Sequence, residues 1–179
     1  MRKRSPARLD FEVDKLTNSI ENILTGEVFE TEIVRLTSDD ILSLTENEWL
    51  FDWKRELDEG REVYKLRTLK SPTMIQGLIS MEARHDHIFI YLIESASFNK
   101  GSLKLFRGVA ANVVAFACKA SFERGFKGYV MFVAKSRLIE HYERSLGAKR
   151  LYGTHMFLDT EAATRLIHSY YKDFDVTRL

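Results

Sequence analysis

Apolar residues recur at helical spacing near the start of the chain. Between residues 13 and 24 they return every three or four positions, which places them on one face of a helix. Asp10 is a good N-cap residue, and Gly26 can close a helix in a left-handed conformation. These signals predict a first helix over residues 10–24.

A strand and two short helices are predicted next. Residues 29–36 alternate between apolar and polar and are rich in β-branched side chains, which is typical of a strand. The polar run at residues 37–40 can cap a short helix through Leu44. The aromatic residues at 49–53 fit either a helix ending near Gly60 or an irregular wall over a pocket, and we favour the helix.

The middle of the chain predicts three strands, a long helix and a fourth strand. Residues 62–69, 74–84 and 87–96 are strand candidates separated by short turns, which indicates an antiparallel meander. The pattern then becomes helical over residues 106–124. Residues 129–134 form a short, unbroken apolar run, typical of a strand buried on both faces. A long helix between two strands implies that those two strands are parallel.

The C-terminal part predicts helix, strand and helix. Apolar positions favour a helix over residues 138–146, residues 151–158 indicate a strand, and residues 160–174 a closing helix begun by Asp159 or Thr160. The whole order predicts an α/β fold of the mixed α+β kind. Its simplest form is a mixed, mostly antiparallel sheet with helices on both faces.

Composition indicates one domain over residues 1–179. The chain is 45% hydrophobic and 12% aromatic, which is enough to bury a full core. The apolar stretch at residues 109–118 is far shorter than the roughly 20 residues of a membrane span, and the N-terminus lacks the apolar segment of a signal peptide. The single cysteine, Cys118, excludes an intramolecular disulfide and is expected to pack in the core. We therefore expect a cytoplasmic protein that does not associate with membranes.

Charge adds little to the list of expected partners. The formal net charge is +1, so no global field draws the protein to nucleic acid. The basic cluster of Arg2, Lys3 and Arg4 with Arg8 is most simply a solvated terminus, and the alternative is an arm that touches nucleic acid. His85 and His87 form a charged turn instead of a metal site, because no third ligand is evident nearby.

The turn that opens the long helix carries the first chemical signal. A diphosphate is bound well by several backbone N–H groups at the positive end of a helix, and small residues let the backbone approach it. Gly108, Ala110 and Ala111 meet that need, although the same residues also suit an ordinary helix start. The residues of this turn are Phe106, Arg107, Gly108, Val109, Ala110 and Ala111.

The order of elements, this turn and the later segment at residues 141–148 resemble the GNAT superfamily of N-acyltransferases, most strongly over residues 62–158. In that family an Arg/Gln-x-x-Gly-x-Gly/Ala turn opens the helix that binds the cofactor's pyrophosphate, and a Phe-Tyr-Glu-Lys-x-Gly-Phe signature lies on a later helix. Leu105 stands where the family usually has arginine or glutamine, and Arg107 could replace that charge. The resemblance implies a GNAT-like sheet, acetyl-CoA as acyl donor, and cofactor contacts at residues 106–111 and at Ser95, Ala96 and Ser97.

The reaction implied by the resemblance is direct transfer of an acetyl group from acetyl-CoA to an amine. The amine must lose a proton and the departing thiolate must gain one, so an acid and a base are useful and no metal is required. Tyr142 is the candidate acid, because the family's tyrosine on this helix lies near the thioester sulfur. An alignment on Gly147 would place Glu143 there instead. Glu94 is the candidate base unless it points to solvent, and Glu82 is a weaker candidate.

Two functions that follow from the resemblance remain open at this stage, beside a third, nucleic-acid association through the N-terminal basic residues. The first is an N-acetyltransferase acting on a small-molecule or peptide amine, and a homodimer is compatible with it. The alternative is a catalytically weakened GNAT-fold protein that serves as a binding or regulatory module, which Leu105 and the register of Tyr142 would permit. Residues 1–60 carry no motif, although this part commonly walls the acceptor channel in the family. Trp49, Phe51 and Trp53 could line that channel or belong to the core.

Overall fold

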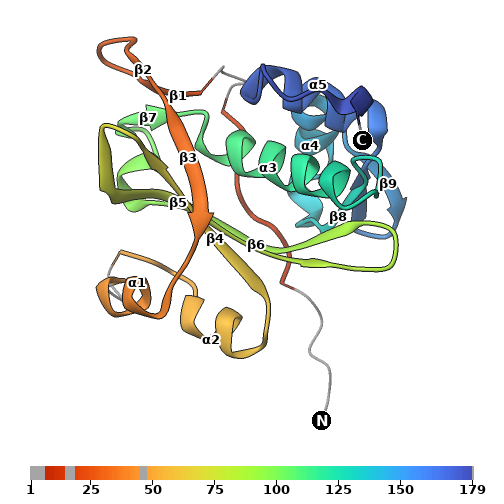
Figure 1. Cartoon of the computed structure of the whole chain (residues 1–179), viewed down its shortest axis with the longest axis horizontal. Coiled ribbons are helices and arrows are strands. Elements are labelled where there is room, and N and C mark those ends of the chain that lie inside the picture. Colours follow the sequence, from red (N-terminus) through yellow and green to blue (C-terminus); the bar gives the residue numbers. More distant parts are fainter. Residues whose placement is uncertain (1–6, 15–18, 45–47, 179) are drawn as a thin grey trace.

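Residues 7–14, 19–44 and 48–178 are described by the computed structural model. Within them, neighbouring strands of a seven-stranded central sheet are antiparallel, apart from one parallel pair, β6 and β8, in the order β3-β4-β5-β6-β8-β10-β9 (Figure 1). The predicted mixed, mostly antiparallel sheet is therefore confirmed. Its strands are β3 (Thr31–Arg35), β4 (Glu62–Thr68), β5 (Ser71–Ala83), β6 (Ile88–Ser95), β8 (Val130–Val133), β9 (Lys149–Tyr152) and β10 (His155–Leu158).

A smaller sheet lies next to the long helix. It has the order β2-β1-β7 and consists of β1 (Ile20–Asn22), β2 (Val28–Phe29) and β7 (Phe106–Arg107). Because β7 ends where the long helix begins, this small sheet fixes the approach of the chain to that helix.

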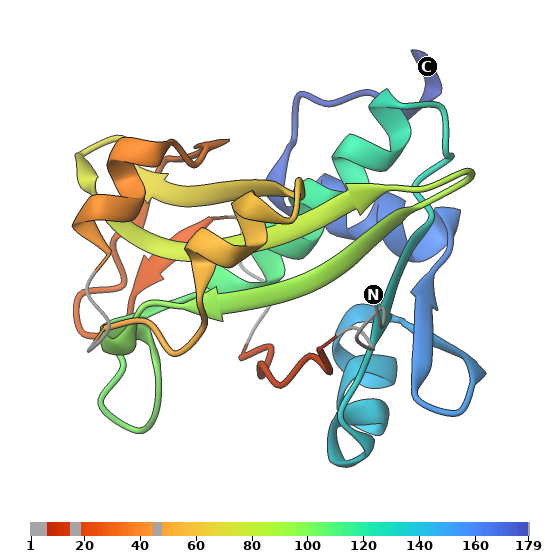
Figure 2. The same cartoon turned by 90° about the horizontal axis from the view of Figure 1, so that it is seen from below.

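Helices cover both faces of the central sheet, as predicted. The pair α1 and α2 lies on one face, and α3 and α5 lie on the other (Figures 1 and 2). The start of α1 has the predicted cap: the side chain of Thr37 accepts from the N–H of Asp40, whose carboxylate accepts from the N–H of Thr37. The helices are α1 (Ser38–Ser43), α2 (Trp53–Asp58), α3 (Val109–Glu123), α4 (Ile139–Leu146) and α5 (Thr160–Tyr170).

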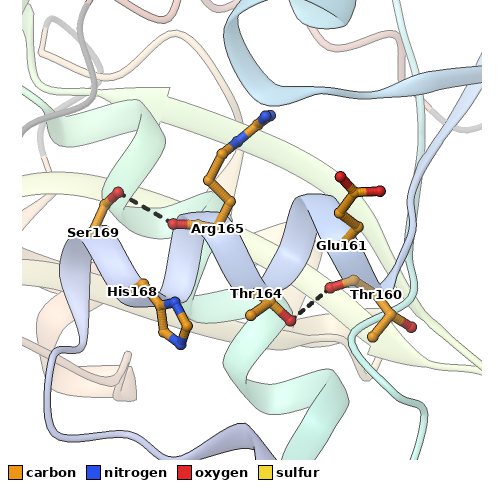
Figure 3. Close-up of a pocket in the computed structure, with 6 residues that line it drawn as sticks. All are labelled: Thr160, Glu161, Thr164, Arg165, His168 and Ser169. Carbon is orange, nitrogen blue, oxygen red and sulfur yellow. Dashed lines mark hydrogen bonds between the residues drawn. The ribbon is translucent and has the colours of Figure 1, made fainter.

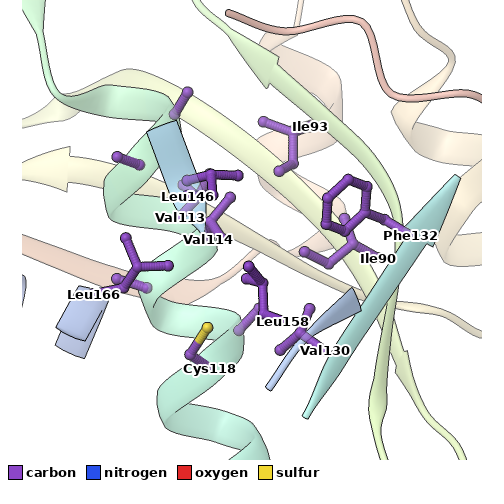
Figure 4. Close-up of a cluster of buried hydrophobic side chains, with 14 of the residues drawn as sticks. Ile90, Ile93, Val113, Val114, Cys118, Val130, Phe132, Leu146, Leu158 and Leu166 are labelled. Carbon is purple, nitrogen blue, oxygen red and sulfur yellow. The ribbon is translucent and has the colours of Figure 1, made fainter. Parts of the chain in front are cut away.

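Two apolar clusters fill the two sides of the sheet. The larger cluster packs α3, α4 and α5 against the strands, and Cys118 is buried in it as predicted (Figure 4). The smaller cluster packs α1 and α2 against β4, β5 and β6. The larger cluster includes Ile90, Ile93, Val113, Phe132, Leu146 and Leu166, and the smaller one includes Leu36, Trp49, Trp53, Val63, Leu78 and Leu92.

A bulge in β6 changes the face to which its later residues point. Tyr91 has no opposite residue on β5, because Ile90 and Leu92 oppose consecutive β5 residues. Ile90 lies in the larger cluster, and Leu92, two residues further on, lies in the smaller one. A bulge inserts one residue and so interrupts the alternation of side chains. Glu94 lies two residues after Leu92 on the strand and therefore points to the same face, which α1 and α2 cover.

The predicted helix over residues 10–24 is wrong. Leu9, Phe11 and Val13 are buried while the residues between them are exposed, which is the period of an extended chain. The physical reason is long-range pairing with β8, which outweighs a weak local preference for helix. The later part of the predicted helix forms β1, and Leu16, on which the helical spacing depended, lies outside the described residues.

Smaller corrections concern the ends of elements. The predicted strand over residues 151–158 is the hairpin of β9 and β10, which turns at Gly153 with a φ of 54°. Gly26 does adopt the left-handed conformation, but in the turn between β1 and β2. The closing helix ends at Tyr170, and the helix predicted to end near Gly60 is the shorter α2. Of the basic cluster, residues 2–4 lie outside the described residues, and Arg8 is exposed.

Within the described parts of the chain, the helices are too short or too polar to cross a membrane.

Candidate active site

The strands β6 and β8 diverge after a short stretch of pairing. Their register contains Ile88 opposite Val130 and Phe89 opposite Met131, although both strands continue further. We call the region between their diverging ends the wedge. The edge of β8 that faces the wedge pairs with Leu9 instead, through a parallel bridge to Ala134 and a hydrogen bond from the Leu9 N–H to the Val133 carbonyl of 2.6 Å.

Residues 9–14, which we call the N-terminal segment, run through the wedge in an extended conformation. Figure 2 shows this dark red stretch between β6 and α4. The N–H of Lys135 donates to the Leu9 carbonyl at 3.1 Å, and the Val13 N–H donates to Nε2 of His141 at 2.8 Å. Asp10 forms ion pairs with Lys135 and Arg137. The hydrogen bond from Lys135 holds the pKa of Asp10 below its usual value, against the opposing effect of burial.

Tyr142 points from α4 into the wedge. Its side chain is fully buried, its ring packs against Phe11 and Phe132, and its hydroxyl donates to the Phe11 carbonyl at 2.7 Å. Burial raises the pKa of this hydroxyl well above its ordinary value, so the hydroxyl keeps its proton at neutral pH. Glu143 is exposed. Of the two residues that the sequence left open, the structure therefore directs Tyr142 and not Glu143 at the wedge.

The turn before α3 forms the other end of the wedge. Gly108 is the N-cap of α3 with a φ of 87°, a conformation that glycine adopts without strain, and Val109, Ala110 and Ala111 behind it are buried. The Gly108 N–H donates to Oδ1 of Asp14 at 3.1 Å. Oδ2 of the same carboxylate pairs with Lys104 at 3.0 Å. The predicted anion-binding turn thus holds an anion that belongs to the chain itself.

Arg107 takes part in the small sheet beside this turn. It opposes Glu21 in the pairing of β7 with β1, and its Nη2 forms an ion pair with the Glu21 carboxylate. Its Nε is buried and has no hydrogen-bond partner among the residues that the structure describes. The predicted charge is therefore present at the turn, with one donor still unused.

The end of β6 was predicted to contact the cofactor through Ser95, Ala96 and Ser97. The Ala96 N–H donates to the Gln76 carbonyl on β5 at 2.9 Å, so it is already used within the sheet. Successive N–H groups of a strand point to opposite sides, so that of Ser95 points towards β8 and the wedge. Ser97 is exposed and begins a short 3-10 helix, Ser97–Asn99.

Glu94 is buried, with 3% of its surface exposed, so the alternative that it points to solvent is wrong. Its Oε1 accepts from the Leu50 N–H at 2.7 Å and from Lys100 Nζ at 2.9 Å. Its Oε2 accepts from Trp53 Nε1 at 2.9 Å and from the Phe51 N–H at 3.3 Å. A carboxylate has about four lone-pair positions, and four donors occupy them. Glu94 therefore ties the segment before α2 to β6, and its predicted role as base stays a prediction.

A hollow of about 540 Å³ lies beside this tied segment. Its walls are mostly apolar and aromatic and include Trp49, Phe51 and Trp53. Both tryptophans also belong to the smaller cluster, so the two alternatives of channel wall and core residue are compatible. Asp52 places a carboxylate at the same hollow while its Oδ1 caps α2.

A second hollow, of about 740 Å³, lies on the outer face of α5 (Figure 3). Its lining comes from this one helix, and the hydroxyls of Thr164 and Ser169 donate to carbonyls of the same helix. The hollow thus has no polar groups converging from different elements. Among the described residues, no group of three or more His, Cys, Asp or Glu side chains is arranged to hold a metal ion.

Comparisons with known proteins agree on the fold. No protein-family model and no curated protein matches the sequence. The AtaT–AtaR complex bound to DNA matches with a TM-score of 0.55 at 16% identity, over 76% of this chain and 99% of that chain. A variant of the AtaT toxin, bound to the C-terminus of its antitoxin AtaR and acetyl-CoA, matches with a TM-score of 0.54 at 17% identity, over 77% and 98%.

A third match is a chimera of the spermidine N-acetyltransferase SpeG from Vibrio cholerae and hSSAT, with a TM-score of 0.52 at 13% identity, over 75% of this chain and 98% of that one. These structures are GNAT acetyltransferases. The chain therefore has a GNAT-like fold.

Proposed function

We propose that the protein is an N-acetyltransferase that uses acetyl-CoA as acyl donor and a small-molecule or peptide amine as acceptor. One observation carries the proposal: the anion-holding turn at Gly108 and the hydroxyl of Tyr142 face the same wedge. The fold supports it, because one structure of this fold was determined with acetyl-CoA bound. An anion site at one end of the wedge and a proton donor at the other suit a ligand that has a diphosphate at one end and a thioester at the other.

The residues at the turn fit the diphosphate of coenzyme A. The Gly108 N–H already binds a carboxylate, Lys104 lies beside it, and the buried Nε of Arg107 has no partner within the described residues. Small residues at positions 110 and 111 let the backbone approach a ligand. The Ser95 N–H points towards the wedge, where it can donate a hydrogen bond to an amide carbonyl of the pantetheine arm of coenzyme A. Acetyl-CoA, when bound, supplies the acetyl group as a thioester.

Tyr142 and Glu94 have different proposed roles. Tyr142 stays protonated because burial raises its pKa, so its hydroxyl can give a proton to the departing sulfur. Glu94 acts as a positioning residue, because its lone-pair positions are filled by the wall that it holds. The amine then loses its proton to solvent. The hollow beside residues 49–54 suits an acceptor with an apolar body, since its walls are mostly apolar, and Asp52 and Lys54 place one carboxylate and one ammonium group beside it.

The test is acceptor-dependent release of the CoA thiol, measured with a panel of amines that includes polyamines and peptide N-termini. We expect Tyr142→Phe to lower kcat by about 100-fold, the usual scale for loss of a general acid, while the variant still binds acetyl-CoA. The variant also loses a hydrogen bond to Phe11, at a cost of about 1 kcal/mol in stability. Tyr129→Phe is the matched control, because Tyr129 is 40% exposed and should keep wild-type turnover.

The outcomes separate the proposal from the alternative. Binding of acetyl-CoA without turnover for any amine would favour a binding or regulatory module. One observation already favours that alternative, since Arg107 is engaged by Glu21 and the wedge contains the N-terminal segment. Absence of acetyl-CoA binding would remove both functions.

A further inference from the structure

The N-terminal segment contacts both ends of the proposed cofactor site. At one end its Asp14 carboxylate accepts the N–H of Gly108, and at the other its Phe11 carbonyl accepts the hydroxyl of Tyr142. These contacts lie three residues apart, about 10 Å along an extended chain. A single stretch of the protein's own backbone thus follows the path proposed for the cofactor.

Each of these contacts uses a donor that the proposed function needs. The Gly108 N–H has one hydrogen, so a well-formed bond to Asp14 and one to a diphosphate exclude each other. The hydroxyl of Tyr142 also has one hydrogen, which is given to Phe11. The carboxylate of Asp14 brings the same sign of charge that a diphosphate would bring to this helix end.

We propose that the N-terminal segment is an intramolecular competitor of acetyl-CoA, which must leave the turn at Gly108 and the hydroxyl of Tyr142 before the cofactor binds. This proposal rests on the proposed function. Asp14 takes the place of the diphosphate, and the Phe11 carbonyl takes the place of the thioester. Docking of the segment and binding of the cofactor therefore weaken each other by the same factor.

The strength of the competitor follows from its other contacts. Leu9, Phe11 and Val13 bury apolar side chains, with 2%, 8% and 6% of their surfaces exposed, and the ion pairs of Asp10 hold the same segment to the loop after β8. Because only molecules with a released segment can bind, the apparent Kd equals the intrinsic value divided by the released fraction. Any change that weakens the segment without touching the rest of the site should tighten cofactor binding.

The experiment compares acetyl-CoA binding by the full chain, by Asp14→Ala and by Glu12→Ala, using isothermal titration. Glu12 is the matched control, because it is an exposed carboxylate of the same segment. We expect Asp14→Ala to bind acetyl-CoA on the order of 10-fold more tightly, within the usual range of such couplings, and Glu12→Ala to match the wild type.

Loss of a negative charge alone could raise affinity, so amide hydrogen exchange supplies the second measurement. With saturating acetyl-CoA, the amides of Leu9 and Val13 should exchange faster while those at the start of α3 become protected. Unchanged or slower exchange of the Leu9 and Val13 amides in the bound protein would overturn the proposal that the segment competes with acetyl-CoA. It would leave the proposed function intact. If the Asp14→Ala variant binds acetyl-CoA and the other two proteins do not, the result would support the proposal that the segment is a competitor. Failure of all three proteins to bind acetyl-CoA would overturn the proposed function.

Discussion

The two faces of the central sheet are stabilised in different ways. The face with α3 and α5 is held by a large apolar cluster, in which most of α3 is buried. On the other face α1 buries no residue, and α2 buries Trp53 in the smaller apolar cluster and is also tied down by carboxylates. Glu56 accepts from Arg61 at 2.6 Å and from Ser80 at 2.5 Å, and Glu94 accepts from the segment before α2.

This difference has a functional meaning. Apolar burial is strong but not directional, so it suits a rigid scaffold. Hydrogen bonds to a buried carboxylate are directional and define where a segment lies. The α3 face is therefore suited to hold the turn at Gly108 still, and the carboxylates of the α1 and α2 face to fix the segment before α2 in place. Segments with few buried apolar contacts also open more easily.

The largest effect is expected on the apolar face. Leu166→Ala removes a fully buried side chain from the larger cluster and leaves a cavity, so the free energy of unfolding should fall by about 3–5 kcal/mol. Leu151→Ala is the control, because Leu151 is 52% exposed and should change stability by less than about 0.5 kcal/mol. Denaturant unfolding measures both. Equal losses in the two variants would contradict the assignment of Leu166 to a tightly packed apolar cluster.

A smaller but more local effect is expected at Glu94. Glu94→Gln keeps the shape but replaces one acceptor oxygen by a donor, which leaves N–H groups of the segment before α2 without an acceptor, and we expect a loss of about 2–3 kcal/mol. Tryptophan fluorescence should report loosening around Trp53. Glu82→Gln, at an exposed carboxylate of β5, should leave both measurements unchanged. A variant of wild-type stability with unchanged fluorescence would mean that Glu94 does not hold the segment before α2 in place.

The turn at Gly108 offers a test of strain and binding together. Gly108→Ala and Gly125→Ala each place a side chain at a positive φ, 87° and 78°, and each should cost about 1–2 kcal/mol of stability. The two glycines lie at opposite ends of α3. Only the Gly108 variant should also weaken acetyl-CoA binding, measured by titration calorimetry. If both variants bind equally well, the assignment of the diphosphate to this turn is wrong.

The smallest effect concerns the ion pairs of Asp10 and depends on pH. Because the folded state holds the pKa of Asp10 below 3.8, its contribution to stability is present above that pH and is lost as the pH falls through the lower, folded value. Asp10→Asn should therefore be less stable than wild type near pH 7 by less than about 1 kcal/mol. Unfolding curves at several pH values should converge below pH 3.8. A difference that grows in acid would contradict the pairing.

The sequence predicted the scaffold well because its signals are long and repeated. Strands and helices between residues 62 and 146 carry clear periodicity, and the small residues after Gly108 are visible as a helix start. The direction of Tyr142 needed the structure, because an alignment on Gly147 left Glu143 as the alternative until its exposure was known.

The remaining features depend on pairing between distant residues. The alternation at Leu9, Phe11 and Val13 competed with a helical pattern that was just as regular, and the edge of β8 that decides between them is set by tertiary structure. The face of Glu94 depends on the bulge at Tyr91, which no local pattern reveals. Sequence reasoning therefore missed the N-terminal segment entirely, although the alternation of apolar and acidic residues over positions 9–14 was a signal that could have found it.

The most direct test of the central claim is a titration of isotope-labelled protein with acetyl-CoA, followed by amide NMR. We predict saturable shifts of the amide signals of Gly108, Ala110, Ala111 and Ser95. The amide signals next to Phe11, whose carbonyl accepts the Tyr142 hydroxyl, should shift at the same ligand concentration. Residues lining the hollow on α5, such as Thr164, should not move. Saturation at α5 without shifts at Gly108, or no saturable shift at any amide, would contradict the claim that the wedge between β6 and β8 binds the cofactor.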